Sequence, residues 1–240
     1  MTVQKPLAEE TNFDTNPPIE LSKYDEAIRQ FCAAYDPLFD MTYSFLKSMT
    51  KENSELLIVG SGTGMEIVTF GLKNPKWKFT GVDPSAEMLS IAEKKIRDSK
   101  LENSVDLFNG YTHELAEGAK YDAATCILVM HFLNDDGAKL ELLESIGSRL
   151  KSGAPFILVD GFGVKGSEEF NRTIAAWKMF AISVGVDSEA VEDGFKNQIL
   201  KRIQFVSEDR IKELLREAGF HSISRYYTSF LYGGWVAEKI

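Results

Sequence analysis

The stretch LLIVGSGTGME, residues 56–66, decides the fold of this 240-residue chain. Four apolar residues predict a buried strand, three alternating glycines break that strand, and the chain then resumes as a helix. Glycine lets the backbone adopt positive φ and removes the Cβ that would keep a ligand away, while a helix start offers unpaired N–H groups at its positive end. The stretch therefore predicts a turn that holds a nucleotide-like ligand.

An acidic residue follows this turn at a distance typical of ribose binding. The second predicted strand, residues 78–82, ends directly before Asp83, which lies 19 residues beyond Gly64. An acidic side chain at the tip of the neighbouring strand reaches ribose hydroxyls at a spacing of about 20 residues. Asp83 is therefore predicted to bind a ribose.

The spacing of the glycines separates two classes of cofactor. A dinucleotide-binding loop would place its third glycine at position 65, where this chain has Met65. The third glycine is instead Gly64, which gives a G-x-G-x-G loop. Together with the following DPSAEML, residues 83–89, this loop resembles the class I S-adenosylmethionine-dependent methyltransferases over roughly residues 54–163.

The resemblance implies a set of cofactor contacts. In that family the glycine loop packs against the methionine part of the cofactor, and the acidic residue after the second strand holds the ribose. Matched onto this chain, the cofactor-binding residues are Gly60, Ser61, Gly62, Gly64, Asp83, Pro84, Met88, Gly110, Tyr111, Thr112 and Leu128. The expected cofactor is S-adenosyl-L-methionine, and S-adenosyl-L-homocysteine is the expected product.

The adenine end of this predicted site has no obvious acidic residue. Many relatives have an aspartate after the third strand, but this chain reads NGYT at residues 109–112, and Tyr111 cannot supply a carboxylate. Recognition of the adenine amino group can then fall to Thr112, to Asn109 or to a backbone carbonyl. Met88 is expected to be a core residue that also touches the adenine.

The rest of the chain predicts a single α/β domain. Strands that alternate with helices indicate a parallel sheet covered on both faces, and the family resemblance implies seven strands in the order 3-2-1-4-5-7-6. The predicted strands span residues 55–59, 78–82, 104–108, 122–128, 155–160, 221–228 and 230–238, and the predicted core helices span 64–72, 85–98, 136–150 and 207–217.

Additions surround this core at three places. We expect a flexible tail over residues 1–21, a helical layer over 22–53 and a helical insertion over 164–206. Residues 22–240 then form one methyltransferase domain. The insertion follows the fifth strand directly, without a strand of its own, and is predicted to cover the cofactor.

The flanking segments resemble the carboxy-S-adenosyl-L-methionine synthase group. The similar segments are AYDP at residues 34–37, AGF at 218–220 and GGWVAEK at 233–239. That group binds a cofactor whose methyl carries a carboxylate, and its product serves tRNA wobble-uridine modification. The resemblance places Lys196 where the group uses an arginine to hold that carboxylate, and Tyr35 where it has a cofactor-side tyrosine. It also implies a homodimer that associates through the insertion.

Three functions remain open at this point. The ordinary glycine loop differs from that of the synthase group and favours a methyltransferase acting on an unidentified acceptor, which we expect to be a small molecule. A synthase-like enzyme using carboxy-S-adenosyl-L-methionine is one alternative. A non-catalytic cofactor-binding subunit that regulates a partner is the other, because a fold alone does not establish an activity.

Methyl transfer demands few catalytic residues. The sulfonium already activates the methyl group, so the protein mainly aligns a nucleophile and, for a weakly acidic one, removes its proton. His131 follows the fourth strand at the edge where ligands of such sheets bind, and its near-neutral ordinary pKa suits a base. The other interpretation of His131 is that it packs against the next helix.

Composition limits the partners that we expect. The net charge of −9 argues against general nucleic-acid binding, which depends on Lys and Arg. The apolar runs are far shorter than the ~20 residues that span a bilayer, and the N-terminus has no signal-peptide core, so we expect a cytoplasmic protein without membrane contact. Cys32 and Cys126 do not suggest a disulfide, and the three histidines lack metal-ligand spacing.

Overall fold

The computed structural model describes residues 12–116, 118 and 121–240 of the chain. Seven strands form one sheet in the order β3-β2-β1-β4-β5-β7-β6, as predicted. The first five strands run parallel, and the terminal hairpin pairs antiparallel with β5. The strands are β1 (Glu55–Val59), β2 (Lys78–Asp83), β3 (Val105–Asn109), β4 (Ala123–Ile127), β5 (Pro155–Gly161), β6 (Phe220–Ser229) and β7 (Tyr232–Lys239).

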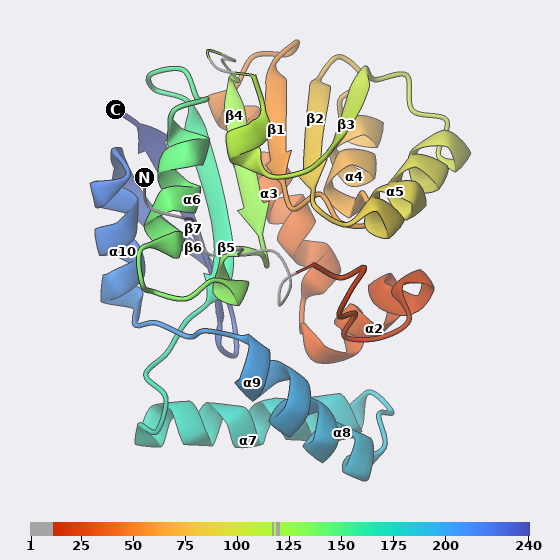
Figure 1. The fold of residues 1–240 in the computed structure, drawn as a ribbon, viewed down its shortest axis with the longest axis vertical. Coiled ribbons are helices and arrows are strands. Elements are labelled where there is room, and N and C mark those ends of the chain that lie inside the picture. Colours follow the sequence, from red (N-terminus) through yellow and green to blue (C-terminus); the bar gives the residue numbers. More distant parts are fainter. Residues whose placement is uncertain (1–11, 117, 119–120) are drawn as a thin grey trace.

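Helices cover both faces of this sheet (Figure 1). One face carries α3 (Tyr35–Met49), α4 (Met65–Lys73) and α5 (Ala86–Asp98), which pack around Leu46 and Phe70. The other face carries α6 (Ala138–Gly147) and α10 (Glu208–Glu217), which bury Leu143 and Leu214. Strands β4 and β5 are buried along their whole length, because a central parallel strand has no solvent-facing side.

Local capping signals explain where several helices begin. Ser85 accepts a hydrogen bond from the Met88 backbone N–H at the start of α5, and Ser207 does the same for Arg210 at the start of α10. One predicted end was wrong. The helix expected over 136–150 stops at Gly147, and Gly153 lies in a separate turn closed by Ala154 N–H and the Lys151 carbonyl.

The helical insertion follows β5 and lies below the sheet in Figure 1. It contains α7 (Glu168–Ser183), α8 (Ser188–Gly194), a π-helical turn η4 (Phe195–Ile199) and α9 (Leu200–Arg202). Trp177 anchors it, because the buried indole packs edge-on against Phe195 and donates a hydrogen bond to the carbonyl of Phe31. That carbonyl ends α2 (Tyr24–Phe31), so the insertion and the N-terminal helices support each other.

The predicted flexible tail lies partly outside the described residues, which begin at Asn12. The described part of it, residues 12–21, packs against the domain. Asp14 accepts hydrogen bonds from the backbone N–H groups of Ala86 (2.8 Å) and Glu87 (3.2 Å) at the start of α5. This segment is continuous with the short 3₁₀ helix η1 (Leu21–Lys23) that precedes α2.

Three further observations concern the described part of the chain. Cys32 and Cys126 are buried free thiols. No cluster of three or more His, Cys, Asp or Glu side chains there could hold a metal ion. None of its helices is long and apolar enough to cross a membrane.

Candidate active site

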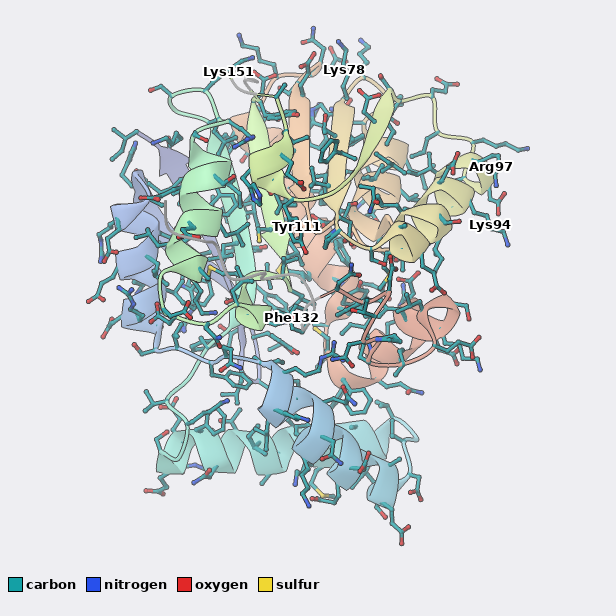
Figure 2. The ribbon with its side chains drawn as sticks, in the orientation of Figure 1. Lys78, Lys94, Arg97, Tyr111, Phe132 and Lys151 are labelled. Atoms are coloured by element: carbon teal, nitrogen blue, oxygen red, sulfur yellow. The ribbon has the colours of Figure 1, made fainter. Side chains whose placement is uncertain are left out.

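A cavity of about 1000 Å³ opens at the carboxyl edge of the parallel strands. Ten of the eleven predicted cofactor-binding residues line it, including Gly60, Gly62, Asp83 and the segment from Gly110 to Thr112. Figure 2 shows Tyr111 and Phe132, two residues of its wall, near the middle of the molecule, whereas the labelled lysines lie at the outer rim. Ligands of open α/β sheets bind at this edge, so the cavity is the candidate active site.

The remaining predicted residue, Gly64, lies behind the cavity wall. Its φ is +78°, and a Cβ at this position would lie 3.0 Å from the Cβ of Ala92 on α5. Gly64 therefore lets α4 begin close to α5 and does not itself face the ligand space. The prediction that Gly64 contacts the cofactor is not supported by its position.

The glycine loop forms the floor of the cavity. The backbone N–H groups of Gly60 and Ser61 both donate to the carbonyl of Val82, at 2.8 and 3.0 Å. Gly60 has a φ of +69°, which side chains other than glycine rarely adopt. A Cβ at Gly60 would lie 2.2 Å from the Val129 methyl carbon Cγ2, so this position has no room for a side chain.

Replacing Gly60 by alanine is expected to destabilise the protein more than replacing Gly62. Both glycines have positive φ, so both variants carry backbone strain of about 1–3 kcal/mol. Only the Gly60→Ala variant must also displace Val129, since a Cβ at Gly62 meets nothing closer than 3.9 Å. Urea unfolding of both variants without cofactor measures the difference, and equal losses would contradict the steric argument.

Asp83 ties the glycine loop to α5. One carboxylate oxygen, Oδ2, accepts from the Gly62 N–H at 2.8 Å, and the other, Oδ1, accepts from the Ser85 N–H at 2.9 Å. Burial raises the pKa of Asp83 to about 6, although these two hydrogen bonds act in the opposite direction. The carboxylate therefore lies fixed in the cavity wall, with remaining lone pairs available to hydroxyl donors.

The adenine end of the predicted site contains Met88, Tyr111 and Thr112. Met88 and Thr112 are buried, and all three line the cavity. Asn109 is not among the lining residues, because its side-chain amide donates to the carbonyls of Asp83 (3.2 Å) and Pro84 (3.0 Å). Of the alternatives for adenine recognition, Thr112 and the backbone of residues 110–112 thus lie at the cavity. The Asn109 side chain instead binds the backbone that follows β2.

These residues fit an adenosyl cofactor. The loop at Gly62 leaves open space beside the Asp83 carboxylate, and hydroxyl donors of a ribose match an acceptor-only group. The first N–H groups of α4, which have no partner within the helix, follow directly after the loop. The site thus offers an apolar wall for a base, an acceptor for a ribose and a close backbone approach.

The three predicted catalytic residues do not lie together. Tyr35, on α3, is buried and lines the cavity. His131 is buried but is not among the lining residues, because its backbone N–H donates to Asp160 Oδ1 at 2.7 Å and its ring Nδ1 lies 3.1 Å from the same oxygen. The structure thus places the His131 ring against Asp160 and Tyr232, and the adjacent Phe132 at the cavity.

Lys196 is also absent from the cavity wall. It is exposed on the π-helical turn η4. The preceding residue, Phe195, is fully buried against Trp177, and this packing directs the next side chain outward. The predicted carboxylate-holding role of Lys196 is therefore not supported by its position.

Sequence reasoning missed several residues of the site. Glu66 lines the cavity and is only 5% exposed; it belongs to the decisive stretch, where the pattern predicts only the start of a helix. Phe13 lies in the predicted tail, and its ring packs against Tyr24 and Phe132, which also line the cavity. No local signal predicts such a contact across more than 100 residues, whereas the acidic residue after a glycine loop is visible in the sequence.

Besides the Asp14 contacts with α5, two further contacts hold the N-terminal segment and α2 in place. Arg202, from α9, donates to the Asn16 carbonyl at 2.7 Å, and its guanidinium lies over the Phe13 ring. Asp25, on α2, accepts from the Thr63 hydroxyl of the glycine loop at 2.6 Å. Helix α2 thus contacts the glycine loop directly, and the insertion contacts the N-terminal segment.

Comparisons with known proteins concern the domain as a whole. Residues 57–156 match a family described as a methyltransferase domain. Over 222 residues the chain is 22% identical to carboxy-S-adenosyl-L-methionine synthase of Desulfotalea psychrophila, covering 90% of this chain and 88% of that protein.

Solved structures show the same fold at low identity. One is 1,6-didemethyltoxoflavin-N1-methyltransferase of Burkholderia thailandensis with bound 1,6-didemethyltoxoflavin and S-adenosylhomocysteine (TM-score 0.59, 17% identity, 91% of this chain and 84% of that chain). Another is magnesium protoporphyrin IX methyltransferase of Synechocystis with bound S-adenosylmethionine (TM-score 0.60, 16% identity, covering 92% of this chain and 84% of that chain).

Proposed function

We propose that this chain, a class I S-adenosylmethionine-dependent methyltransferase, transfers a methyl group to a small-molecule acceptor. The observation that carries the proposal is the cavity that joins the glycine loop to an aromatic wall. Its volume of about 1000 Å³ is at the upper end of the ~300–1000 Å³ range of small-molecule sites, which leaves room for an acceptor beside the cofactor.

Aromatic side chains favour a flat acceptor. The wall beyond the predicted cofactor residues includes the rings of Phe13, Tyr24, Tyr35, Phe39 and Phe132. Such rings bury the faces of planar molecules at small entropic cost. The Burkholderia structure of this fold binds 1,6-didemethyltoxoflavin, which supports a small acceptor of comparable size here.

The residues of the site act mainly by alignment. S-adenosylmethionine supplies a methyl group already activated on sulfur. Asp83 would hold the ribose and the glycine loop the methionine part, and the aromatic wall would position the acceptor and exclude water. Burial raises the pKa of the Tyr35 hydroxyl well above its ordinary value, so Tyr35 is neutral and acts as a hydrogen-bond partner rather than as a base.

An isotope experiment tests the proposal. The purified chain is incubated with S-adenosylmethionine labelled in its methyl group and with a cell extract separated into small-molecule and macromolecular fractions. We expect label in a small-molecule product, with an equal amount of S-adenosylhomocysteine. Label only in protein or RNA would overturn the small-molecule acceptor. No transfer to any fraction despite cofactor binding would favour a non-catalytic, cofactor-binding subunit.

A synthase-like activity is the second candidate, because the synthase of Desulfotalea psychrophila aligns with 90% of this chain. The exposed position of Lys196 weakens it, since that side chain is not at the cavity. Mass spectrometry of any small molecule released from the denatured protein separates the two candidates. Release of carboxy-S-adenosyl-L-methionine would favour the synthase, and release of S-adenosylmethionine or S-adenosylhomocysteine would favour the methyltransferase.

We also propose that two copies associate through the insertion. Three apolar side chains around α7 are exposed: Val164 (59%), Met179 (62%) and Val184 (45%). Met179 lies on α7 itself, whereas Val164 precedes the helix and Val184 caps its end. Contiguous exposed apolar surface is typical of association sites. Sedimentation velocity is expected to show a dimer that Met179→Glu converts into a monomer, and a wild-type monomer at micromolar concentration would refute the association.

A cytoplasmic location is proposed as well, because both cysteines are buried free thiols.

A further inference from the structure

Glu66 is a buried acidic residue that has no role in the methyl transfer described above. It is the second residue of α4, directly after the glycine loop, and its side chain lines the cavity. One carboxyl oxygen, Oε1, accepts a hydrogen bond from the Thr125 hydroxyl of β4 at 2.6 Å. Among the described residues, no lysine or arginine forms an ion pair with it. An ionised carboxylate buried without a cation is costly, so such a group becomes neutral unless a ligand supplies the opposite charge.

The groups around Glu66 do not supply that charge. Three titratable residues interact with it: Tyr35 from α3, Cys126 from β4 and Tyr226 from β6. Burial raises the pKa of each of the three, so all are neutral at pH 7. Burial also raises the pKa of Glu66 to about 8, and the hydrogen bond from Thr125 only partly opposes this rise. Without ligand, Glu66 is therefore mostly protonated at pH 7.

The order of the strands places Glu66 at one end of the proposed cofactor. Along the edge β3-β2-β1-β4, the predicted adenine contacts follow β3, the ribose acceptor Asp83 ends β2, and the glycine loop follows β1. Glu66, on α4, comes next, since its carboxyl is hydrogen-bonded to Thr125 in the middle of β4. An adenosyl cofactor that enters adenine first at β3 therefore reaches β4 with its amino-acid end, which carries an ammonium group.

We propose that Glu66 binds the α-ammonium group of S-adenosylmethionine and releases its proton to solvent when the cofactor binds. This inference rests on the proposed function, because it requires the cofactor to occupy the cavity. The incoming ammonium replaces the missing counter-charge, which makes the ionised carboxylate the favoured form. Proton release is thus the thermodynamic consequence of the contact.

Titration calorimetry with S-adenosylhomocysteine at pH 7, in two buffers of different ionisation enthalpy, measures this proton. We expect close to one proton released per ligand bound by the wild-type protein and none released by Glu66→Gln. The amide oxygen of that variant still accepts from Thr125, so the variant is expected to fold. Glu93→Gln is the matched control, because Glu93 is an exposed glutamate on α5 that does not line the cavity, and the proton count of this variant should equal that of the wild type.

A second ligand separates the ammonium contact from a structural role. 5′-Methylthioadenosine has the adenine, ribose and sulfur of the cofactor but lacks its amino-acid part. We expect Glu66→Gln to weaken S-adenosylhomocysteine by about tenfold or more, as for the loss of a charged hydrogen bond. The affinity for 5′-methylthioadenosine should stay unchanged.

The outcomes distinguish this inference from the proposed function. Wild-type binding of S-adenosylhomocysteine without proton release, or an equal loss of affinity for both ligands in Glu66→Gln, would overturn the role of Glu66 and leave the methyltransferase intact. Failure of the wild-type protein to bind S-adenosylhomocysteine at all would overturn the proposed function itself.

Discussion

Asp160→Ala is expected to lower the free energy of unfolding by about 3–5 kcal/mol, as for the removal of one partner from a buried ion pair. Asp160 and Lys139 are both fully buried, with 4.0 Å between Oδ2 and Nζ. The Lys139 ammonium also donates to the Met130 carbonyl at 3.0 Å. That carbonyl is neutral, so the Asp160 carboxylate is the group that balances the positive charge of Lys139. The variant would also remove the acceptor for the His131 N–H. Urea unfolding measures the loss.

A double-mutant cycle tests whether the charge is the cause. Asp160→Asn keeps an oxygen acceptor but removes the negative charge, and Lys139→Met removes the positive charge while retaining most of the side-chain volume. The Asp160→Asn/Lys139→Met protein is expected to be more stable than the sum of the single losses predicts, because neither charge is left alone. Strictly additive losses would show that the pair is not coupled.

Asp83→Ala is expected to weaken binding of S-adenosylhomocysteine by about 1–3 kcal/mol, the range for hydrogen bonds to a charged acceptor. The ribose hydroxyls lose their acceptor, and the N–H groups of Gly62 and Ser85 lose theirs. Asp83→Asn is the control, since it retains one oxygen acceptor and should bind better than the alanine variant. Unchanged calorimetric affinity in Asp83→Ala would remove the ribose assignment.

The pKa of Asp83 predicts that protein stability and cofactor affinity change with pH in opposite directions. Its pKa in the folded protein, about 6, is above the ordinary 3.8, so its contribution to the stability of the free protein is fully present below pH 3.8 and is lost as the pH rises through 6. Ribose hydroxyls donate to the ionised form, so cofactor affinity should instead fall as the pH drops below 6. Asp83→Asn should abolish both effects; calorimetry and thermal unfolding on both sides of this pKa measure them.

Local patterns explain most of what could be predicted. Strand and helix positions follow from short periodic runs, and the observed strand bounds differ from the predicted ones by only one or two residues. The glycine loop and Asp83 follow from backbone conformation and spacing, which depend on few neighbours. The surroundings of the individual side chains predicted to be catalytic followed less well from the sequence, because the direction of such side chains depends on distant partners.

His131 and Lys196 show why. The position of His131 after β4 suggests a base, but Asp160 on β5 accepts from its backbone N–H and lies 3.1 Å from its ring Nδ1. The ring therefore packs behind Phe132 and is not among the residues that line the cavity. The resemblance to the synthase group places Lys196 at the cofactor, but the packing of Phe195 against Trp177 leaves it exposed. Asp160 and Trp177, which decide these two positions, each lie on another element, so the residues next to His131 and Lys196 in the sequence do not reveal them.

The sequence by itself determined the positions of the strands and the glycine loop with the acidic residue that follows it, since turn chemistry and hydrophobic periodicity act over a few residues. The tertiary structure alone decided which side chains enclose the cofactor cavity. It brought Phe13 to Phe132, Arg202 to Asn16 and Glu66 to Thr125. These contacts join residues 59 to 186 positions apart, and only the packing of whole elements fixes such distances.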